Sequence, residues 1–280
     1  MRCSPFNEEA IMTKTIVYLS HGGGPLPLLG DPGHVEMGRV LKEISAGISR
    51  PSAILVVSAH WEEALPTITS GPRPDLIYDY YGFPEAAYRI SYPCPGAPDL
   101  ARETARMLER SGIQSRLDGS RGFDHGLFIP LKIIYPEADI PCIQLSLMAS
   151  LDPAAHIGLG RALGDLSWEN LLVVGSGFSF HNMRAFFSDE TPESREKNLA
   201  FDRWLRETCG EPLGEQERAH RLVNWEKVPH ARYCHPREEH LLPLHFCYGM
   251  AGSPCSRVFE LEIMGKQSSM ILWDPSPDKG

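Results

Sequence analysis

A chain of 280 residues with 42% hydrophobic residues is long enough to bury a large α/β core. Its formal net charge is -9 and it has no cluster of lysine and arginine, which argues against binding to nucleic acid or to an anionic membrane surface. The first ten residues carry two glutamates where a signal peptide needs an apolar core, and no apolar run reaches membrane-spanning length. The seven cysteines lack CxxC spacing, which favours reduced thiols, so we expect a cytoplasmic protein.

The first predicted elements are two apolar strands that each lead to a histidine. Residues 15–19 (TIVYL) are typical of a buried strand, and His21 follows at the start of a glycine-rich loop. A crossover helix is predicted at residues 32–47 and a second strand at residues 53–58, after which comes His60. This βαβ unit predicts parallel strands, and ligands of such sheets collect at the carboxyl ends of the strands.

The middle of the chain is expected to alternate short strands, helices and loops. An aromatic-rich loop at residues 77–84 contains Tyr80 and Tyr81, whose rings could cover a pocket. A loop at residues 121–126 contains His125. The other expected elements are strands at 66–71, 88–92, 113–117 and 140–147, and helices at 127–135, at 153–166 and from an N-cap at Asp99 to residue 112.

The last part of the chain contains a third strand that leads to a histidine. This strand is predicted at residues 171–174, and His181 follows a little beyond it. Residues 189–226 are polar and helical, and the end of the chain should contain a helix at 236–245 with an acidic first turn and strands at 258–264 and 269–273. We therefore predict a single-domain α/β fold over residues 1–280, with a mostly parallel or mixed sheet flanked by helices and residues 1–13 as a loose extension.

Three histidines at strand ends indicate a metal or acid–base site. A single histidine in such a place is more often structural, but His21, His60 and His181 recur at three strand ends. Neutral imidazole is the commonest protein metal ligand, and three protein ligands with open positions are typical of a catalytic metal. Residues 22–24 (GGG) and 175–177 (GSG) lack the spacing of a nucleotide-binding loop or a nucleophile elbow, so those functions are not favoured.

Five motifs along the chain carry a family resemblance. They are SHGGGP at 20–25, SAHW at 58–61, FDHG at 123–126, GSG at 175–177 with the nearby HN at 181–182, and EHLLPL at 239–244. Together they resemble the LigB-type extradiol ring-cleavage dioxygenases, in the branch that includes DOPA dioxygenases. The resemblance implies a non-haem Fe(II) enzyme that opens the ring of a substituted catechol with O2, and Zn(II) could replace the iron in purified protein.

The resemblance also implies roles for individual residues. The metal would be held by His21, His60 and His240. His181 would be the catalytic acid–base residue, and His125 a second catalytic histidine that contacts the substrate. Because the general iron oxygenase pattern is two histidines and one carboxylate, Glu239 is an alternative third ligand.

Further residues are expected around the substrate. Gly22 and Gly23 would leave room for it, and Tyr80 and Tyr81 could pack on the catechol or simply bury a loop. His235 and Arg237 lie near His240 in the sequence and could bind an acidic substrate tail, since arginine binds carboxylates. A solvated helix start is the alternative for these two residues.

Two other functions stay open at this stage. One is a non-catalytic metal-binding or interaction protein, similar to the Memo-like proteins. The other is a zinc-dependent hydrolase, because a three-histidine site also suits Zn(II). The sequence leaves a homo-oligomer open and does not define the substituents of the catechol.

Overall fold

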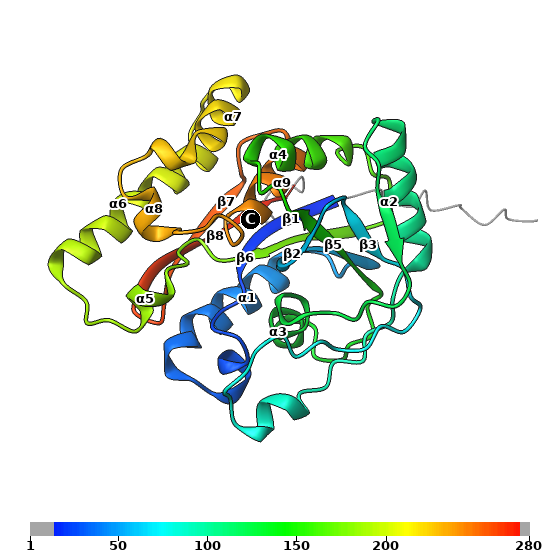
Figure 1. Ribbon diagram of the computed structural model, residues 1–280, viewed down its shortest axis with the longest axis horizontal. Coiled ribbons are helices and arrows are strands. Elements are labelled where there is room, and N and C mark those ends of the chain that lie inside the picture. The colour runs from blue at the N-terminus through cyan, green and yellow to red at the C-terminus, as the bar shows by residue number, and fades with distance from the viewer. Residues whose placement is uncertain (1–13, 275–280) are drawn as a thin grey trace, which may run out of the picture.

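The structure, a computed structural model, describes residues 14–274 and contains one mixed eight-stranded sheet between two layers of helices (Figure 1). The strand order is β4-β3-β5-β2-β6-β1-β8-β7. These strands are β1 (Lys14–Ser20), β2 (Ala53–Glu63), β3 (Thr67–Thr69), β4 (Arg116–Asp118), β5 (Cys142–Met148), β6 (Leu171–Gly177), β7 (Arg257–Ile263) and β8 (Lys266–Trp273). The predicted fold class is confirmed, and the predicted extension at residues 1–13 lies outside the described residues.

The central strands β5, β2, β6 and β1 are parallel neighbours, as the βαβ pattern predicted. β8 and β7 extend the sheet in antiparallel fashion beside β1. β3 is antiparallel to β5 and parallel to β4, so the sheet is mixed at both edges. The carboxyl ends of the four central strands therefore lie along one edge of the sheet, where a ligand site is expected.

Helices cover both faces of the sheet. They are α1 (Val35–Gly47), α2 (Pro98–Arg110), α3 (His125–Ile134), α4 (Pro153–Ala162), α5 (Met183–Phe186), α6 (Pro192–Gly210), α7 (Glu215–Val223), α8 (Ala231–Cys234) and α9 (Leu242–Ala251). α1 and α3 lie on one face, and α4 and α9 lie on the other (Figure 1). In the described residues, no helix is long and apolar enough to cross a membrane.

Because helices cover both faces of the sheet, the central strands are continuous apolar runs in the sequence. In β1, Val17 and Leu19 belong to the core cluster on the side of α1 and α3. Ile16 and Tyr18, the alternate residues, belong to the cluster on the side of α4 and α9. A strand buried on both faces needs apolar side chains at every position, because neighbouring side chains point to opposite faces.

The strand predicted at residues 88–92 is wrong. The chain instead forms a 3-10 helix (Glu85–Arg89) followed by extended residues that belong to no sheet. Two tyrosine hydroxyls from the aromatic loop donate to this backbone, Tyr80 to the Ala87 carbonyl at 2.7 Å and Tyr78 to the Ile90 carbonyl at 2.6 Å. Side chains therefore satisfy carbonyl groups that a neighbouring strand would otherwise bind.

The predicted N-cap of α2 also differs. The cap residue is Ala97, and the helix begins at Pro98, so Asp99 lies inside the first turn. Proline favours the first helical position because its fixed φ suits the helix and no N–H is needed there. Asp99 instead pairs with Arg102 and still places negative charge at the helix N-terminus.

The helix predicted at residues 236–245 begins only at Leu242, and its first turn carries no acidic residue. The carbonyl of His240 accepts hydrogen bonds from the Tyr18 hydroxyl at 2.9 Å and from the Phe178 N–H at 3.0 Å. Because these groups occupy that carbonyl, and because Pro243 favours the first turn, the helix starts later than predicted. His240 is thus held in a turn and not on a helix face.

Candidate metal centre and active site

Two of the predicted metal ligands come from strands on either side of β6. Ser20 in β1 pairs with Gly177 in β6, and Ser58 in β2 pairs with Ser176, so the strands reach the edge of the sheet at the same level. His21 directly follows β1, and its backbone N–H donates to the Gly177 carbonyl at 3.0 Å. The register therefore places His21 close to the position that His60 occupies beyond Ser58.

His60 does not follow the end of β2 as predicted but lies inside the strand. β2 continues to Glu63, and its register with β5 shifts between Ser58 and Glu62. Such an irregularity bends a strand and redirects its side chains. It lets His60 turn toward His21, and the two ring Nε2 atoms are 3.0 Å apart.

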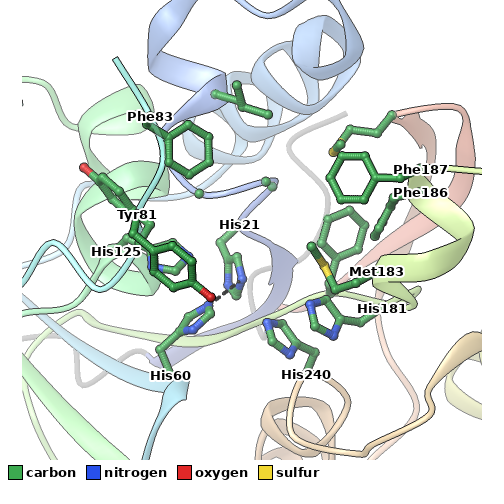
Figure 2. A pocket seen from close by; sticks show the side chains of 17 residues that line it. His21, His60, Tyr81, Phe83, His125, His181, Met183, Phe186, Phe187 and His240 are labelled. Carbon is green, nitrogen blue, oxygen red and sulfur yellow. Dashed lines mark hydrogen bonds between the residues drawn. The ribbon is translucent and has the colours of Figure 1, made fainter. Parts of the chain in front are cut away.

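His240 reaches the same place from the turn before α9. A Cβ atom on Gly177 would lie only 2.1 Å from the His240 carbonyl oxygen, so the missing side chain of this glycine is what lets the turn come so close. The backbone that approaches this glycine is that of His240. The three predicted ligands thus converge from β1, β2 and the turn at residue 240 (Figure 2).

The spacing of these three rings fits one bound metal. A nitrogen ligand lies about 2.1 Å from such a metal, which puts the ring centres of two ligands about 4.5 to 5.2 Å apart for bond angles between right-angled and tetrahedral. The observed ring-centre distances are 4.7 Å for His21 and His60, 5.0 Å for His60 and His240, and 5.2 Å for His21 and His240. Two ligand nitrogens at a right angle would also be about 3.0 Å apart, as the Nε2 atoms of His21 and His60 are.

Hydrogen bonds to the Nδ1 atoms indicate that the Nε2 lone pairs face the centre. The Ser176 hydroxyl donates to the Gly126 carbonyl at 2.5 Å, so it accepts from Nδ1 of His21 at 3.0 Å. A carboxylate of Glu239 accepts from Nδ1 of His240 at 2.9 Å. His60 has Nδ1 3.6 Å from a carboxylate oxygen of Asp79. Such outer partners orient metal-binding histidines and fix their tautomer.

Electrostatics also keep these ligands neutral, as metal binding requires. Burial and the surrounding histidines lower the pKa of His21 well below its usual value. The same causes, burial first, lower the pKa of His60 and of His240. Three imidazoles with lone pairs that face one another form an unfavourable arrangement unless a cation lies between them, so the residues present fit a divalent metal.

Glu239, the alternative third ligand, contacts two of the histidines from behind. Its Oε1 lies 2.9 Å from Nδ1 of His240 and 3.3 Å from Nδ1 of His181, so one carboxylate oxygen orients both rings. Burial is the largest single influence and raises the pKa of Glu239, but the hydrogen bond with His181, a backbone hydrogen bond and the charges of His181 and Arg237 together lower it, so the net shift is downward. The carboxylate is thus engaged by two histidines, and the geometry favours His240 over Glu239 as the third ligand.

His125 and His181 flank the proposed ligands. His125 also lies close enough to His21 and His60 to join a metal group, but its ring centre is only 3.9 Å from that of His60, shorter than two ligands of one metal would be. Its Nδ1 pairs with Asp79 at 2.8 Å. His181 stacks on His240 with ring centres 3.4 Å apart and an interplanar angle of 14°. Both histidines therefore stand beside the metal position with their Nδ1 atoms paired to carboxylates.

These five histidines form the floor of a cavity of about 440 Å³ (Figure 2). The predicted substrate residues Gly22, Gly23, Tyr80 and Tyr81 also line it. The cavity wall is completed by Gly24, Leu26, Phe83, Phe178, Met183, Phe186, Phe187 and Met264. Its volume lies within the range of small-molecule sites.

The geometry argues against the substrate contact expected for His235. Its side chain is fully buried between Phe201 and Trp225, and its Nε2 lies 2.9 Å from the Ser179 carbonyl. Burial lowers its pKa to about 3. His235 therefore belongs to the core behind the site. Its neighbour Arg237 forms a bidentate pair with Glu62 and does not line the cavity.

Several contributing residues were missed in the sequence. Asp79 was seen only as part of the aromatic loop, and Ser176 only as part of a GSG motif. Met183, Phe186 and Phe187 follow His181 closely, but a four-residue helix such as α5 has too few positions to show a periodic pattern. Asp79 lies well apart from the motifs at 58–61 and 123–126 in the sequence, so only the fold brings it to the histidines.

Asp79 offers a test of this outer shell. One of its oxygens accepts from the backbone and ring of His125, and the other faces His60. We expect Asp79→Asn to weaken metal binding about 10- to 100-fold, because loss of an outer-shell partner typically has this effect. Competition with a chelator would measure the affinity. An unchanged affinity would show that Asp79 does not orient the metal-binding rings.

Comparison with known proteins agrees with this site. Residues 17–270 match the family described as the catalytic LigB subunit of aromatic ring-opening dioxygenase, and the chain belongs to this family. The matched residues include all five histidines of the cavity floor.

Individual relatives are similar to the chain over most of its length. The chain is 42% identical to dioxygenase tasH of Hapsidospora irregularis, over 84% of this chain and 78% of that protein. It is 35% identical to the 4,5-DOPA dioxygenase extradiol of Mirabilis jalapa (85% and 87% covered) and 34% identical to that of Escherichia coli K12 (88% and 89% covered). A crystal structure of an uncharacterized Escherichia coli K12 protein is similar, with a TM-score of 0.71 at 27% identity, covering 92% of this chain and 98% of that one.

Proposed function

We propose that the protein is an Fe(II)-dependent extradiol dioxygenase that opens the ring of a substituted catechol with O2. The observation that carries this proposal is the convergence of three neutral histidines beside two further histidines in one cavity. The names of the relatives, dioxygenase and 4,5-DOPA dioxygenase extradiol, support the same reaction class.

In this proposal His21, His60 and His240 hold the iron through their Nε2 atoms. When bound, Fe(II) supplies Lewis acidity toward the catechol hydroxyls and electron transfer between the ring and O2. Three protein ligands leave open positions for small molecules, as catalytic metal sites require. Ser176, Asp79 and Glu239 keep the rings oriented from behind.

His181 acts as the acid–base residue. Because its Nδ1 faces Glu239, its Nε2 is left for the cavity, where it accepts the proton of a catechol hydroxyl. The same nitrogen returns that proton when the O–O bond breaks. His125 has the matching arrangement, with Nδ1 on Asp79 and Nε2 left to hydrogen-bond the substrate.

The residues beyond the metal set favour an enzyme over a non-catalytic binding protein. A binding protein needs no second pair of carboxylate-oriented histidines, whereas His125 and His181 provide one here. A zinc-dependent hydrolase is the second candidate, because three histidines also suit Zn(II). Whether the protein uses Fe(II) or Zn(II) decides between ring opening and hydrolysis, because Zn(II) has no redox chemistry.

Oxygen uptake tests the proposal directly. Protein loaded anaerobically with Fe(II) is mixed with a panel of catechols and then with O2, and uptake is recorded together with the yellow colour of a ring-opened semialdehyde. We expect one O2 consumed per catechol opened, and no uptake by the Zn(II)-loaded protein. Iron-loaded protein that consumes no O2 with any member of a broad panel would contradict the proposed function.

A further inference from the structure

The walls of the cavity above the histidine floor contain no charged side chain. Among the described residues that line it there is no lysine, arginine, aspartate or glutamate. The walls consist of glycine backbone and the side chains of Leu26, Tyr80, Tyr81, Phe83, Phe178, Met183, Phe186, Phe187 and Met264. The chemistry of a ligand's substituent must match this apolar surface.

Apolar side chains gather on two opposite sides of the cavity mouth. Tyr81 and Phe83 come from the loop after β3, whereas Met183, Phe186 and Phe187 come from α5 and its end (Figure 2). Three of the seven large hydrophobic side chains exposed in the described residues belong to this mouth: Tyr81 at 90%, Phe187 at 77% and Met183 at 54% exposure. Exposed apolar side chains that cluster around a cavity indicate a binding surface for an apolar group.

The arginines near the site along the chain do not line the cavity: Arg184 in α5 is exposed to solvent, and Arg237 and Arg121 are engaged elsewhere. Arg237 binds Glu62 through two hydrogen bonds of 2.6 and 2.7 Å and also lies 3.4 Å from Glu239. Arg121 pairs with the buried Asp124 and stacks over Trp61. A substrate carboxylate placed against the cavity lining would therefore lose water without finding an arginine or lysine among the lining residues, which is unfavourable.

We infer that the substrate is a catechol with an uncharged apolar substituent, alkyl or aryl, and not one with the charged amino-acid tail of DOPA. This inference rests on the proposed function and narrows its substrate class. The catechol hydroxyls face the histidine floor, and the substituent lies between the loop after β3 and α5. The aromatic rings at the mouth give it a large apolar contact at little cost in side-chain entropy.

A matched pair of ligands tests how the charge of the substituent affects binding. The acid 3-(3,4-dihydroxyphenyl)propanoate and its methyl ester differ at one end only, and their binding to the Zn(II)-loaded protein is measured by calorimetry, without turnover. We expect the ester to bind at least about tenfold more tightly than the acid, and DOPA to bind as weakly as the acid. Equal or tighter binding of the acid or of DOPA, or no binding of either member of the pair, would overturn the inference.

The same pair of ligands in the oxygen-uptake assay tests the apolar substrate class separately from the dioxygenase function. If the iron-loaded protein opens the acid and DOPA faster than the ester, the dioxygenase function stands and the apolar substrate class fails. If the ester binds more tightly but no catechol is opened, the apolar site stands and the dioxygenase function fails. The expected result is a higher kcat/KM for the ester, again by about tenfold or more.

A variant of Phe187 tests the location of the substituent. This side chain is mostly exposed, so Phe187→Arg should leave the fold intact while it adds a cation at the mouth. We expect Phe187→Arg to shift the ester-to-acid preference about tenfold toward the acid. Leu117→Arg, an exposed apolar position on the far edge strand β4, is the matched control and should leave the preference unchanged. An unchanged preference in Phe187→Arg would place the substituent elsewhere.

Discussion

His21→Ala is expected to lose its metal almost completely. The ring centre of His21 lies 4.7 Å from that of His60 and 5.2 Å from that of His240, so His21 is one of three rings whose spacing fits a single metal. Losing an outer-shell partner already weakens binding about 10- to 100-fold, and losing a ligand should exceed this range. Metal analysis after loading and desalting would measure the occupancy.

The control for this variant is a histidine far from the site. His220 is exposed on α7, and His220→Ala should keep full metal occupancy. Thermal unfolding of the metal-free proteins should show that His21→Ala is folded, because the change removes one hydrogen bond to Ser176 and the close approach of the Nε2 atoms of His21 and His60. Full iron occupancy in folded His21→Ala would mean that the metal lies elsewhere among the five histidines.

His181→Ala should keep its metal but lose ring cleavage. Its ring stacks on His240 and faces Glu239, so it stands beside the ligand set and can exchange a proton with the substrate. Positioned acid–base groups contribute about 10²- to 10⁴-fold to rates, and we expect kcat to fall by a factor in this range. Single-turnover oxygen uptake at matched iron content would measure the loss.

Two observations would distinguish a catalytic from a merely structural role for His181. Oxygen uptake by the iron-loaded variant should fall sharply, whereas binding of a catechol to the Zn(II)-loaded variant should change little. Wild-type rates in the iron-loaded variant would remove His181 from the mechanism. A large loss of metal would instead move His181 into the ligand set.

The sequence by itself determined the fold class and the edge of the sheet at which the site lies. Apolar runs at residues 15–19, 53–58 and 171–174 predicted buried strands, and parallel strands bring their carboxyl ends to one edge. His21 follows from that rule, whereas His60 lies inside β2 and faces His21 because the strand is irregular there. The match of five spaced motifs then indicated the family, which the comparison confirmed.

The tertiary structure decided which side chains face one another. His235 and Arg237 are near His240 in the chain, yet one is buried in the core and the other is bound to Glu62, because the turn before α9 is fixed by hydrogen bonds to Tyr18 and Phe178. Such contacts join segments far apart in sequence and leave no local pattern. For the same reason, only the folded chain brings Asp79 and Ser176 behind the three proposed metal-binding rings. Only the folded chain also places the apolar side chains of α5 opposite the aromatic loop.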